Sequence, residues 1–214
     1  MRERGIIFNA EMVRAVLSGS KTQTRRIVKA SAAYILNLQE QYPHKHYTIN
    51  CPFGAVGDRL WVRETWQVIH QYTDENGEVD ETRYARSIPK QRGNYWHPVY
   101  AEAWDNESRE SRDFPWRPSL HMPRWASRIT LEITGVRVER LRDISEEDAA
   151  TEGIPPAGDL LPDYPGTYLT PKGDFATAKV AFQRLWESIY GEESWQANPW
   201  VWVIEFKRVE VNRA

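Results

Sequence analysis

The chain has 214 residues and a mass of 25.0 kDa, which is enough for one sizeable domain or two very small ones. With 41% hydrophobic residues, 27% charged residues and a mean hydropathy of -0.67, its composition excludes a largely disordered chain and a coiled coil. No stretch approaches the ~20 apolar residues of a membrane span, and the single cysteine, Cys51, excludes an internal disulfide framework. The N-terminal segment lacks the apolar run of a secretory signal. We expect a soluble, cytoplasmic protein that does not contact a membrane.

The net charge of -2 argues against a nonspecific DNA-binding protein covered in positive charge. The charges are nevertheless segregated along the chain. Residues 1–30 contain seven basic and two acidic side chains, a balance of 7 − 2 = +5, whereas residues 143–163 contain seven acidic side chains and no lysine or arginine. A charged run usually forms a solvated face, but these two segments also contain the sharpest motifs of the chain.

The N-terminal part of the chain predicts a strand, a helix and a second strand. Residues 5–8 are a short apolar strand candidate, and Asn9 can cap a helix over residues 10–18 whose apolar positions share one face. Gly19 ends this helix, because glycine adopts the left-handed conformation without steric cost. Residues 22–28 contain several β-branched side chains and predict a strand.

The middle of the chain combines one clear strand with two regions that lack periodicity. Residues 29–52 are polar and are expected to be irregular. Residues 59–69 (RLWVRETWQVI) predict one long strand, and alternation makes Glu64 the only polar side chain on its apolar face. Residues 70–125 contain turn signals, prolines and tryptophans, and are expected to form long loops with a strand at 99–104.

The C-terminal part predicts further strands and two helices. Residues 127–141 alternate over two strand lengths, with Gly135 as a bulge or bend. A capping box begins a short helix over 145–153, a second helical pattern covers 175–190, and 200–211 form a final alternating strand. Several long strands with short to medium helices indicate the α+β class, in the form of a small β-barrel with helices at its rim and a long loop insertion.

The octet Gly19-Ser-Lys-Thr-Gln-Thr-Arg-Arg26 is the most informative segment. Lysine and arginine side chains at a corner between a helix and a strand offer several donors that can converge on a carbonyl or a phosphate. The segment lacks the upstream glycines of a P-loop, which argues against nucleoside triphosphate hydrolysis. A basic surface strand would have the same spacing, so the residues alone leave that interpretation open.

The spacing within this octet resembles the G-x-K-x-x-x-x-R signature of ASCH domains, through Gly19, Lys21, Thr24 and Arg26. ASCH domains share a PUA-like β-barrel. The turn at 57–58, the acidic helix from 145 and the closing strand at 203–207 are also similar to the family. The resemblance implies a single domain over 1–214 with insertions at about 29–52 and 70–125. The length and the aromatic insertion are similar to larger ASCH proteins carried by phages and prophages.

Compact members of the ASCH family include bacterial amidohydrolases that deacetylate N4-acetylcytidine. The resemblance implies that Lys21 and Thr24, from the first motif, and Glu152, from the acidic helix, are the catalytic residues. Glu146 and Glu147 are alternatives for the glutamate.

These three residue types suit the hydrolysis of an amide, which needs a nucleophile, a base and a donor to the leaving amine. Thr24 could attack or orient a water, and Lys21 could be the base if burial or the charges of Arg25 and Arg26 lower its pKa. Glu152 suits an acid, because the macrodipole at a helix C-terminus disfavours a carboxylate. Lys21 and Thr24 are three positions apart, so a shared site requires the turn to continue through Lys21.

Residues 114–125 (FPWRPSLHMPRW) form a second group of candidates. The segment combines Trp116 and Trp125 with Arg117 and Arg124, and aromatic faces next to guanidinium groups can stack a base and hold a phosphate. A loop that only covers the barrel would look the same, so packing is the favoured interpretation and ligand binding the alternative.

Arg25, Arg26 and Glu64 complete the substrate-binding candidates. Glu64 could meet a ligand at the mouth of the barrel or pair with a basic residue on a neighbouring strand. The five histidines lack metal-ligand spacing, so no metal and no cofactor is expected.

The sequence therefore favours a protein that binds RNA or a modified pyrimidine nucleoside and hydrolyses an N4-acylcytidine-type amide. A non-catalytic RNA-binding module is the alternative, since a barrel cleft and a basic motif suffice for it. A ribonuclease is less favoured, because no pair of histidines suits metal-free acid and base cleavage. The oligomeric state is not predicted.

Overall fold

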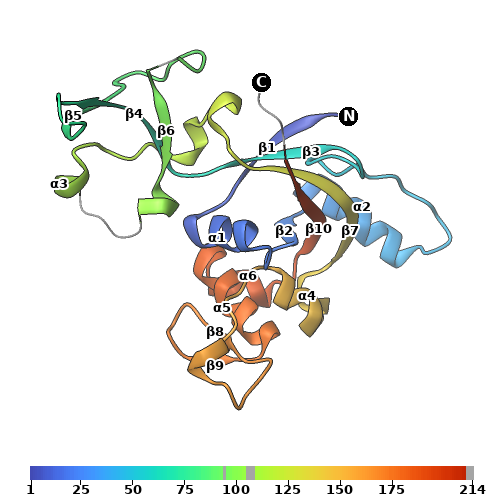
Figure 1. Cartoon of the computed structure of the whole chain (residues 1–214). Helices are drawn as coiled ribbons and strands as arrows, with labels where there is room; N and C mark the ends of the chain where they lie inside the picture. Colours follow the sequence, from blue (N-terminus) through green and yellow to red (C-terminus); the bar gives the residue numbers. More distant parts are fainter. Residues whose placement is uncertain (94, 105–108, 211–214) are drawn as a thin grey trace. The chain divides into compact units, whose positions relative to one another are not determined.

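The computed structural model describes residues 1–93, 95–104 and 109–210 (Figure 1). The described chain forms two compact units. The first consists mainly of Ala15–Arg59 and Leu131–Arg208, and the second mainly of Glu3–Arg14 and Leu60–Thr130. Helix α1 (Ala10–Ser18) contributes residues to both. The single domain expected from the resemblance stays a prediction.

The sheet of the first unit positions the residues discussed below. Its strands follow the order β7 (Thr130–Arg140), β10 (Trp200–Val209) and β2 (Gln23–Ile27). β10 and β2 are antiparallel, with Val203 opposite Arg25. Since paired residues in a ladder share a face, this register fixes which β2 side chains point to the same side.

Helices cover one face of this sheet. The apolar core there joins Val201 and Val203 of β10 to Phe182 and Trp186. The elements of this layer are α4 (Glu146–Thr151), α5 (Ala178–Tyr190), α6 (Glu192–Gln196), the short strands β8 (Tyr168–Leu169) and β9 (Phe175–Ala176), and the 3-10 turns η4 (Leu141–Asp143) and η5 (Gly158–Leu160). In Figure 1, β8 and β9 lie beside α5, which they contact.

The second unit contains the paired strands β1 (Glu3–Ile7) and β3 (Arg59–Arg63), a three-stranded sheet and an apolar core. The three-stranded sheet has the order β5 (Val79–Tyr84), β4 (Trp66–Thr73) and β6 (His97–Tyr100). Its remaining elements are η1 (Ala101–Trp104), α3 (Arg109–Arg112), η2 (Ser119–His121) and η3 (Arg124–Ala126). Trp66 and Val68 of β4 pack with Met122 and Ala126 in the core.

Several predictions about local structure are confirmed. α1 spans the predicted residues and ends at Gly19, whose φ is +81°. α4 begins where the capping box predicted, because the Ser145 side chain accepts a hydrogen bond from the Asp148 backbone N–H. The strands β1, β2 and β10 lie within two residues of their predicted bounds, although Val211 lies outside the described residues.

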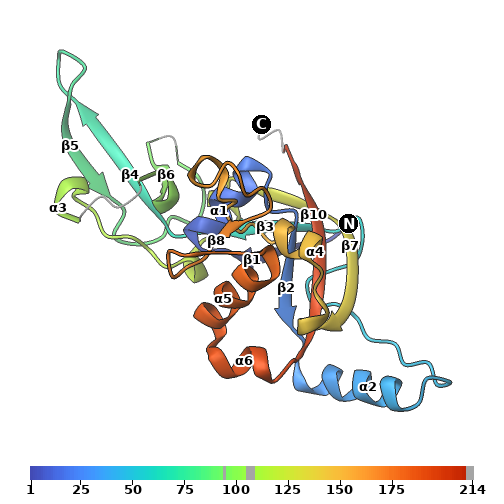
Figure 2. The same ribbon diagram turned by 90° about the horizontal axis from the view of Figure 1, so that it is seen from below.

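The prediction that residues 29–52 are irregular is wrong for residues 30–41 and confirmed for residues 42–52, which form no helix or strand. Residues Ala30–Gln41 form α2, which in Figure 2 extends beyond the ends of β2 and β10. Only Leu36 of this helix is buried, so the apolar stripe that identifies most helices is weak. Its alanines, leucines and glutamines are strong helix formers, and this propensity was the available signal.

Two further predictions are corrected by the hydrogen bonding of the second unit. Residues 59–69 form two strands, β3 and β4, because the chain leaves the ladder at Glu64 and Thr65, where the Thr65 carbonyl accepts from Ala101 instead. Residues 70–125 contain more regular structure than expected. The strand expected at 99–104 begins at His97 and ends at Tyr100, where η1 follows.

The α+β class is confirmed by this combination of sheets and helices. Residues 127–141 contribute one continuous strand, β7, with Gly135 in its interior, and the helix expected over 175–190 begins at Ala178 because β9 takes the preceding residues. Closure of the strands into a barrel stays a prediction. No helix of the described chain is long and apolar enough to cross a membrane.

Candidate functional site

The turn between α1 and β2 brings Lys21 to the end of α4. The backbone N–H of Lys21 donates to Ala15, and that of Thr22 donates to Thr151, the last residue of α4. Lys21 thereby forms a backbone bridge with Glu152, before β2 begins at Gln23. The turn continues through Lys21, as a shared site required.

Gly153 makes this close approach possible. Its φ of +86° is in the left-handed region, which ends α4 without strain only for glycine. A Cβ atom at Gly153 would lie 2.8 Å from the Cβ atoms of both Ala15 and Lys21. The glycine therefore serves both the chain reversal after Glu152 and the seating of Lys21 against it.

Lys21, Glu152 and Arg25 form a buried charge cluster. The Lys21 ammonium donates to the backbone oxygen of Glu152 at 2.5 Å and to its Oε2 at 2.9 Å, and Arg25 Nη1 donates to Oε1 at 2.8 Å. The Lys21 and Arg25 side chains are fully buried, and the Glu152 side chain is 4% exposed. One carboxylate thus joins two cations that have no contact with solvent.

Burial lowers the pKa of the Lys21 amine, because a charged ammonium loses its hydration. The attraction and hydrogen bond of Glu152 act in the opposite direction, and the positive charges of Arg26 and Arg25 add to the lowering. The direction is that expected for a lysine that acts as a base.

An outer ring of charges surrounds Arg25. Its Nε and Nη2 donate to Glu139 at 2.9 and 2.6 Å, and Nη2 also donates to Asp148 at 2.8 Å. Arg137 in turn pairs with Asp148 and Glu205. All three guanidinium nitrogens of Arg25 are therefore used within the protein, which makes it a structural member of the cluster.

The face of β2 explains which predicted residues meet. Lys21, Gln23 and Arg25 alternate along the chain toward α4, and Gln23 Nε2 donates to the backbone of Asp148 at 2.6 Å. Thr24 is buried, but its register partner is Ile204, whereas Arg25 faces Val203. Successive side chains of a strand point to opposite faces, so the structure brings Lys21, Arg25 and Glu152 together and places Thr24 on the other face. Arg26 shares that other face and is half-buried.

Sequence reasoning missed several members of the cluster, namely Gln23, Arg137, Glu139, Asp148 and Glu205. Gln23 could have been predicted from the sequence. It lies between Lys21 and Arg25, and in a strand every second side chain points to the same face. Glu139 and Glu205 belong to strands whose order in the sheet no local pattern reveals.

Glu64 lies in the second unit in an ion pair, the alternative that the sequence left open. Arg128 holds its carboxylate with two hydrogen bonds, of 3.0 and 2.8 Å, and also donates to Glu102 at 2.8 Å. Burial raises the pKa of Glu64, against the opposing charge and hydrogen bonds of Arg128. Its proposed contact with a ligand stays a prediction.

The aromatic and basic residues of 114–125 are engaged in packing within the second unit. Trp125 donates from its indole to Pro89 and meets Trp66 edge to face, and Trp116 meets Phe114 in the same way. Arg117 donates to Gln67 and to the Ala85 carbonyl, and Arg124 pairs with Glu3. These contacts favour the packing interpretation, and substrate binding by the four residues stays a prediction.

Within the described residues, no group of histidine, cysteine and carboxylate side chains has an arrangement that could hold a metal ion.

Comparison with known proteins gives a match among the solved structures. No protein-family model and no curated protein matches the chain. The chain is similar to a crystal structure of an ASCH domain from Lactobacillus crispatus JV V101, at 13% sequence identity, over 97% of this chain and 79% of that chain, with a TM-score of 0.36. Membership of the ASCH family stays a prediction from the motif.

Proposed function

We propose that this protein is an amidohydrolase of N4-acylcytidine-type amides, with Lys21 as its base. The observation that carries the proposal is the buried contact between Lys21 and Glu152, 2.9 Å between Nζ and Oε2 across 131 positions of sequence. The resemblance to the ASCH motif implies the same pair of residues. A fully buried lysine with a lowered pKa supports a base, because only the neutral amine accepts a proton.

The reaction needs one water and one proton carrier. A neutral Lys21 has two N–H groups, which suffice for its hydrogen bonds to the backbone and carboxylate oxygens of Glu152. Its lone pair takes a proton from the attacking water as the water oxygen bonds to the acyl carbon. The bond between the acyl carbon and the N4 nitrogen then breaks, and the Lys21 ammonium returns the proton to that nitrogen. Cytidine and a carboxylic acid result, so atoms and protons balance.

Glu152 and Arg25 act on Lys21 in this scheme. Glu152 orients the amine through Oε2, and Arg25 fixes the carboxylate through Oε1. The water replaces Thr24 as the attacking group, because Thr24 lies on the opposite face of β2. Asp148 and Glu205 lie at the edge of the cluster, where their side chains are 31% and 45% exposed.

The non-catalytic RNA-binding alternative has less support from this site. It requires Arg25 and Arg26 to contact phosphates, but every guanidinium nitrogen of Arg25 is already bonded to a carboxylate. Carboxylates around a phosphate site would also repel the ligand.

The experiment is incubation of the protein with N4-acetylcytidine and chromatography for cytidine, using Lys21→Met and a matched Lys29→Met control at an exposed lysine. We expect product with the native chain and the control, and at least 100-fold less with Lys21→Met, in the range of an acid–base catalyst. Circular dichroism and thermal melting show whether Lys21→Met is folded. No product from the native chain at high concentration overturns the proposal, as does full activity of a folded Lys21→Met.

A further inference from the structure

The three-stranded sheet of the second unit has two chemically different ends. On one face of β4, Trp66 and Val68 pack into the core, while His70 and Tyr72 continue the same face beyond it. The rings of His70 and Tyr72 are 4.2 Å apart between centroids, and Tyr95 and Trp96 approach His70 at 5.7 and 5.9 Å. Four rings from two parts of the chain thus gather where the core ends.

These rings are open to solvent. Tyr95 is 71% exposed and Tyr72 is 38% exposed, whereas His70 and Trp96 are half-buried beneath them. Nδ1 of His70 is buried and has no hydrogen-bond partner among the described residues. Large rings with a polar edge are ordinarily covered or hydrogen-bonded, so an open cluster of this kind suits a flat, polar ligand.

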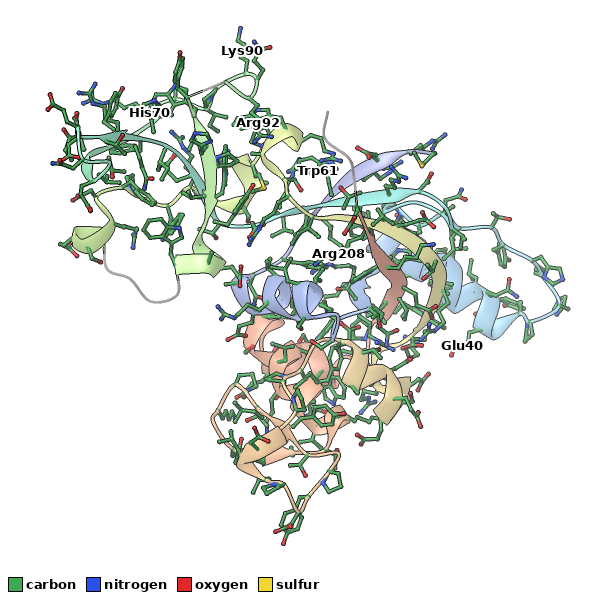
Figure 3. All side chains as sticks on the ribbon, viewed as in Figure 1. Glu40, Trp61, His70, Lys90, Arg92 and Arg208 are labelled. Atoms are coloured by element: carbon green, nitrogen blue, oxygen red, sulfur yellow. The ribbon has the colours of Figure 1, made fainter. Side chains whose placement is uncertain are left out.

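Positive charge borders the ring cluster. Residues 82–101 contain four basic side chains, Arg83, Arg86, Lys90 and Arg92, and no aspartate or glutamate. Arg83 lies over the Tyr72 ring at 4.6 Å and pairs with Glu81. The other three are exposed and form no ion pair within the described part of the chain. Figure 3 shows Lys90 and Arg92 on the segment between β5 and β6, with His70 on β4.

We propose that this surface, formed by His70, Tyr72, Tyr95, Trp96 and the exposed Arg86, Lys90 and Arg92, binds single-stranded nucleic acid. Exposed rings provide stacking faces for unpaired bases, and the cations neutralise the phosphates that follow them. The turn that follows β4, residues 74–78, contains Asp74, Glu75 and Glu78 and would repel a phosphate chain, so the nucleic-acid strand runs from the rings toward Lys90 and Arg92. This site is independent of the amidohydrolase proposal, because it uses none of the same residues.

The test is fluorescence anisotropy of the full chain with labelled oligouridylate and oligothymidylate of about 12 nucleotides, within the site sizes typical of such surfaces. Tyr95→Ala and the double variant Lys90→Ala/Arg92→Ala are compared with Tyr164→Ala and Lys172→Ala, which remove an exposed tyrosine and an exposed lysine from the first unit. We expect Tyr95→Ala to weaken binding by about 5- to 150-fold, as for loss of one stacked base. The double variant should weaken binding and reduce the slope of log K against log salt by about 0.7 per lost phosphate contact. Both controls should bind like the native chain.

The remaining arms separate this proposal from its alternatives. RNA and DNA oligonucleotides distinguish the two sources of unpaired bases, and binding of either one supports the site. Equal affinity for polyglutamate of the same charge overturns the proposal in favour of a surface that binds acidic proteins. Equal affinity for duplex DNA overturns it in favour of a surface that binds phosphate charge without stacking bases. Absence of binding by the native chain, or native binding by Tyr95→Ala, also overturns it.

Discussion

Lys21 and Glu152 are joined twice, once through the Glu152 backbone oxygen and once through its carboxylate. The first bond comes from the position of the α4 terminus and the second from the glutamate side chain. The lysine is therefore held in place by the fold and oriented by a residue that can be replaced. The position of Lys21, its protonation and its role in turnover therefore depend on different contacts.

The lowered pKa of Lys21 should appear in the pH profile of hydrolysis. We expect kcat/KM to rise with pH and to level off below the ordinary lysine pKa of 10.5, because the neutral amine is the active form. Arg26→Gln removes a positive charge that lowers this pKa, so the rising limb should move to higher pH. A limb that stays at the same pH in Arg26→Gln would contradict the assignment of the limb to Lys21.

The same pKa makes stability depend on pH. Folding lowers the pKa of Lys21 below 10.5, so between the two values the unfolded chain binds more protons than the folded chain. The free energy of unfolding should therefore rise with pH across that window in the native chain. Urea unfolding at several alkaline pH values, compared with Lys21→Met, should show that this contribution disappears in the variant. An identical slope in both proteins would show that Lys21 has an ordinary pKa.

Arg25 should be indispensable for folding rather than for binding a substrate. Arg25→Met leaves the carboxylates of Glu152, Glu139 and Asp148 without their shared cation, and we expect a loss of about 3–5 kcal/mol in the free energy of unfolding. Arg142→Met, at an exposed arginine of the same unit, should change it by less than about 0.5 kcal/mol. Chemical denaturation measures both, and a native-like Arg25→Met would show that the cluster is not buried in solution.

Gly153→Ala should destabilise the protein for two reasons. The φ of +86° is unfavourable for alanine by about 1–2 kcal/mol, and the new Cβ would lie 2.8 Å from Ala15 and Lys21. Gly166→Ala is the control, because its φ is +85° but nothing lies within 4 Å of the added Cβ. Gly153→Ala should lose more stability than Gly166→Ala and also lose hydrolysis. Equal effects on both would show that the close approach to Lys21 is unimportant.

Glu64 should contribute to stability without taking part in hydrolysis. Glu64→Ala removes the carboxylate that holds Arg128 by two hydrogen bonds, and we expect a loss of about 2–3 kcal/mol. Glu102→Ala removes one hydrogen bond from the same arginine and should cost less, about 1 kcal/mol. Thermal melting and the cytidine assay together test this, and loss of turnover in a stable Glu64→Ala would show instead that Glu64 contacts the substrate.

The sequence predicted correctly the helices whose ends carry capping residues. Asn9, Gly19 and Ser145 mark the ends of α1 and the start of α4, and the structure has them in those roles. α2 was missed because its apolar residues do not form a sharp stripe. The break between β3 and β4 was missed because alternation continues through Glu64, which is as buried as its apolar neighbours.

The candidate site was only partly accessible to sequence reasoning. Lys21 and Glu152 came from a family motif, and the period of the strand already cast doubt on Thr24 sharing their face. Glu139 and Asp148 reach Arg25 from 114 and 123 positions away, so their role depends on strand order and on the docking of α4. Such long-range ion pairs leave no trace in local periodicity or propensity.

The backbone oxygen that accepts from Lys21 has an evolutionary consequence. No substitution at position 152 removes a main-chain carbonyl, so a descendant that lost the glutamate would still keep its lysine anchored at the end of α4. Such a chain would be only one codon away from the complete pair. Position 152 can therefore change while the backbone anchor of Lys21 is kept, at a cost in stability from the two buried cations that the glutamate joins.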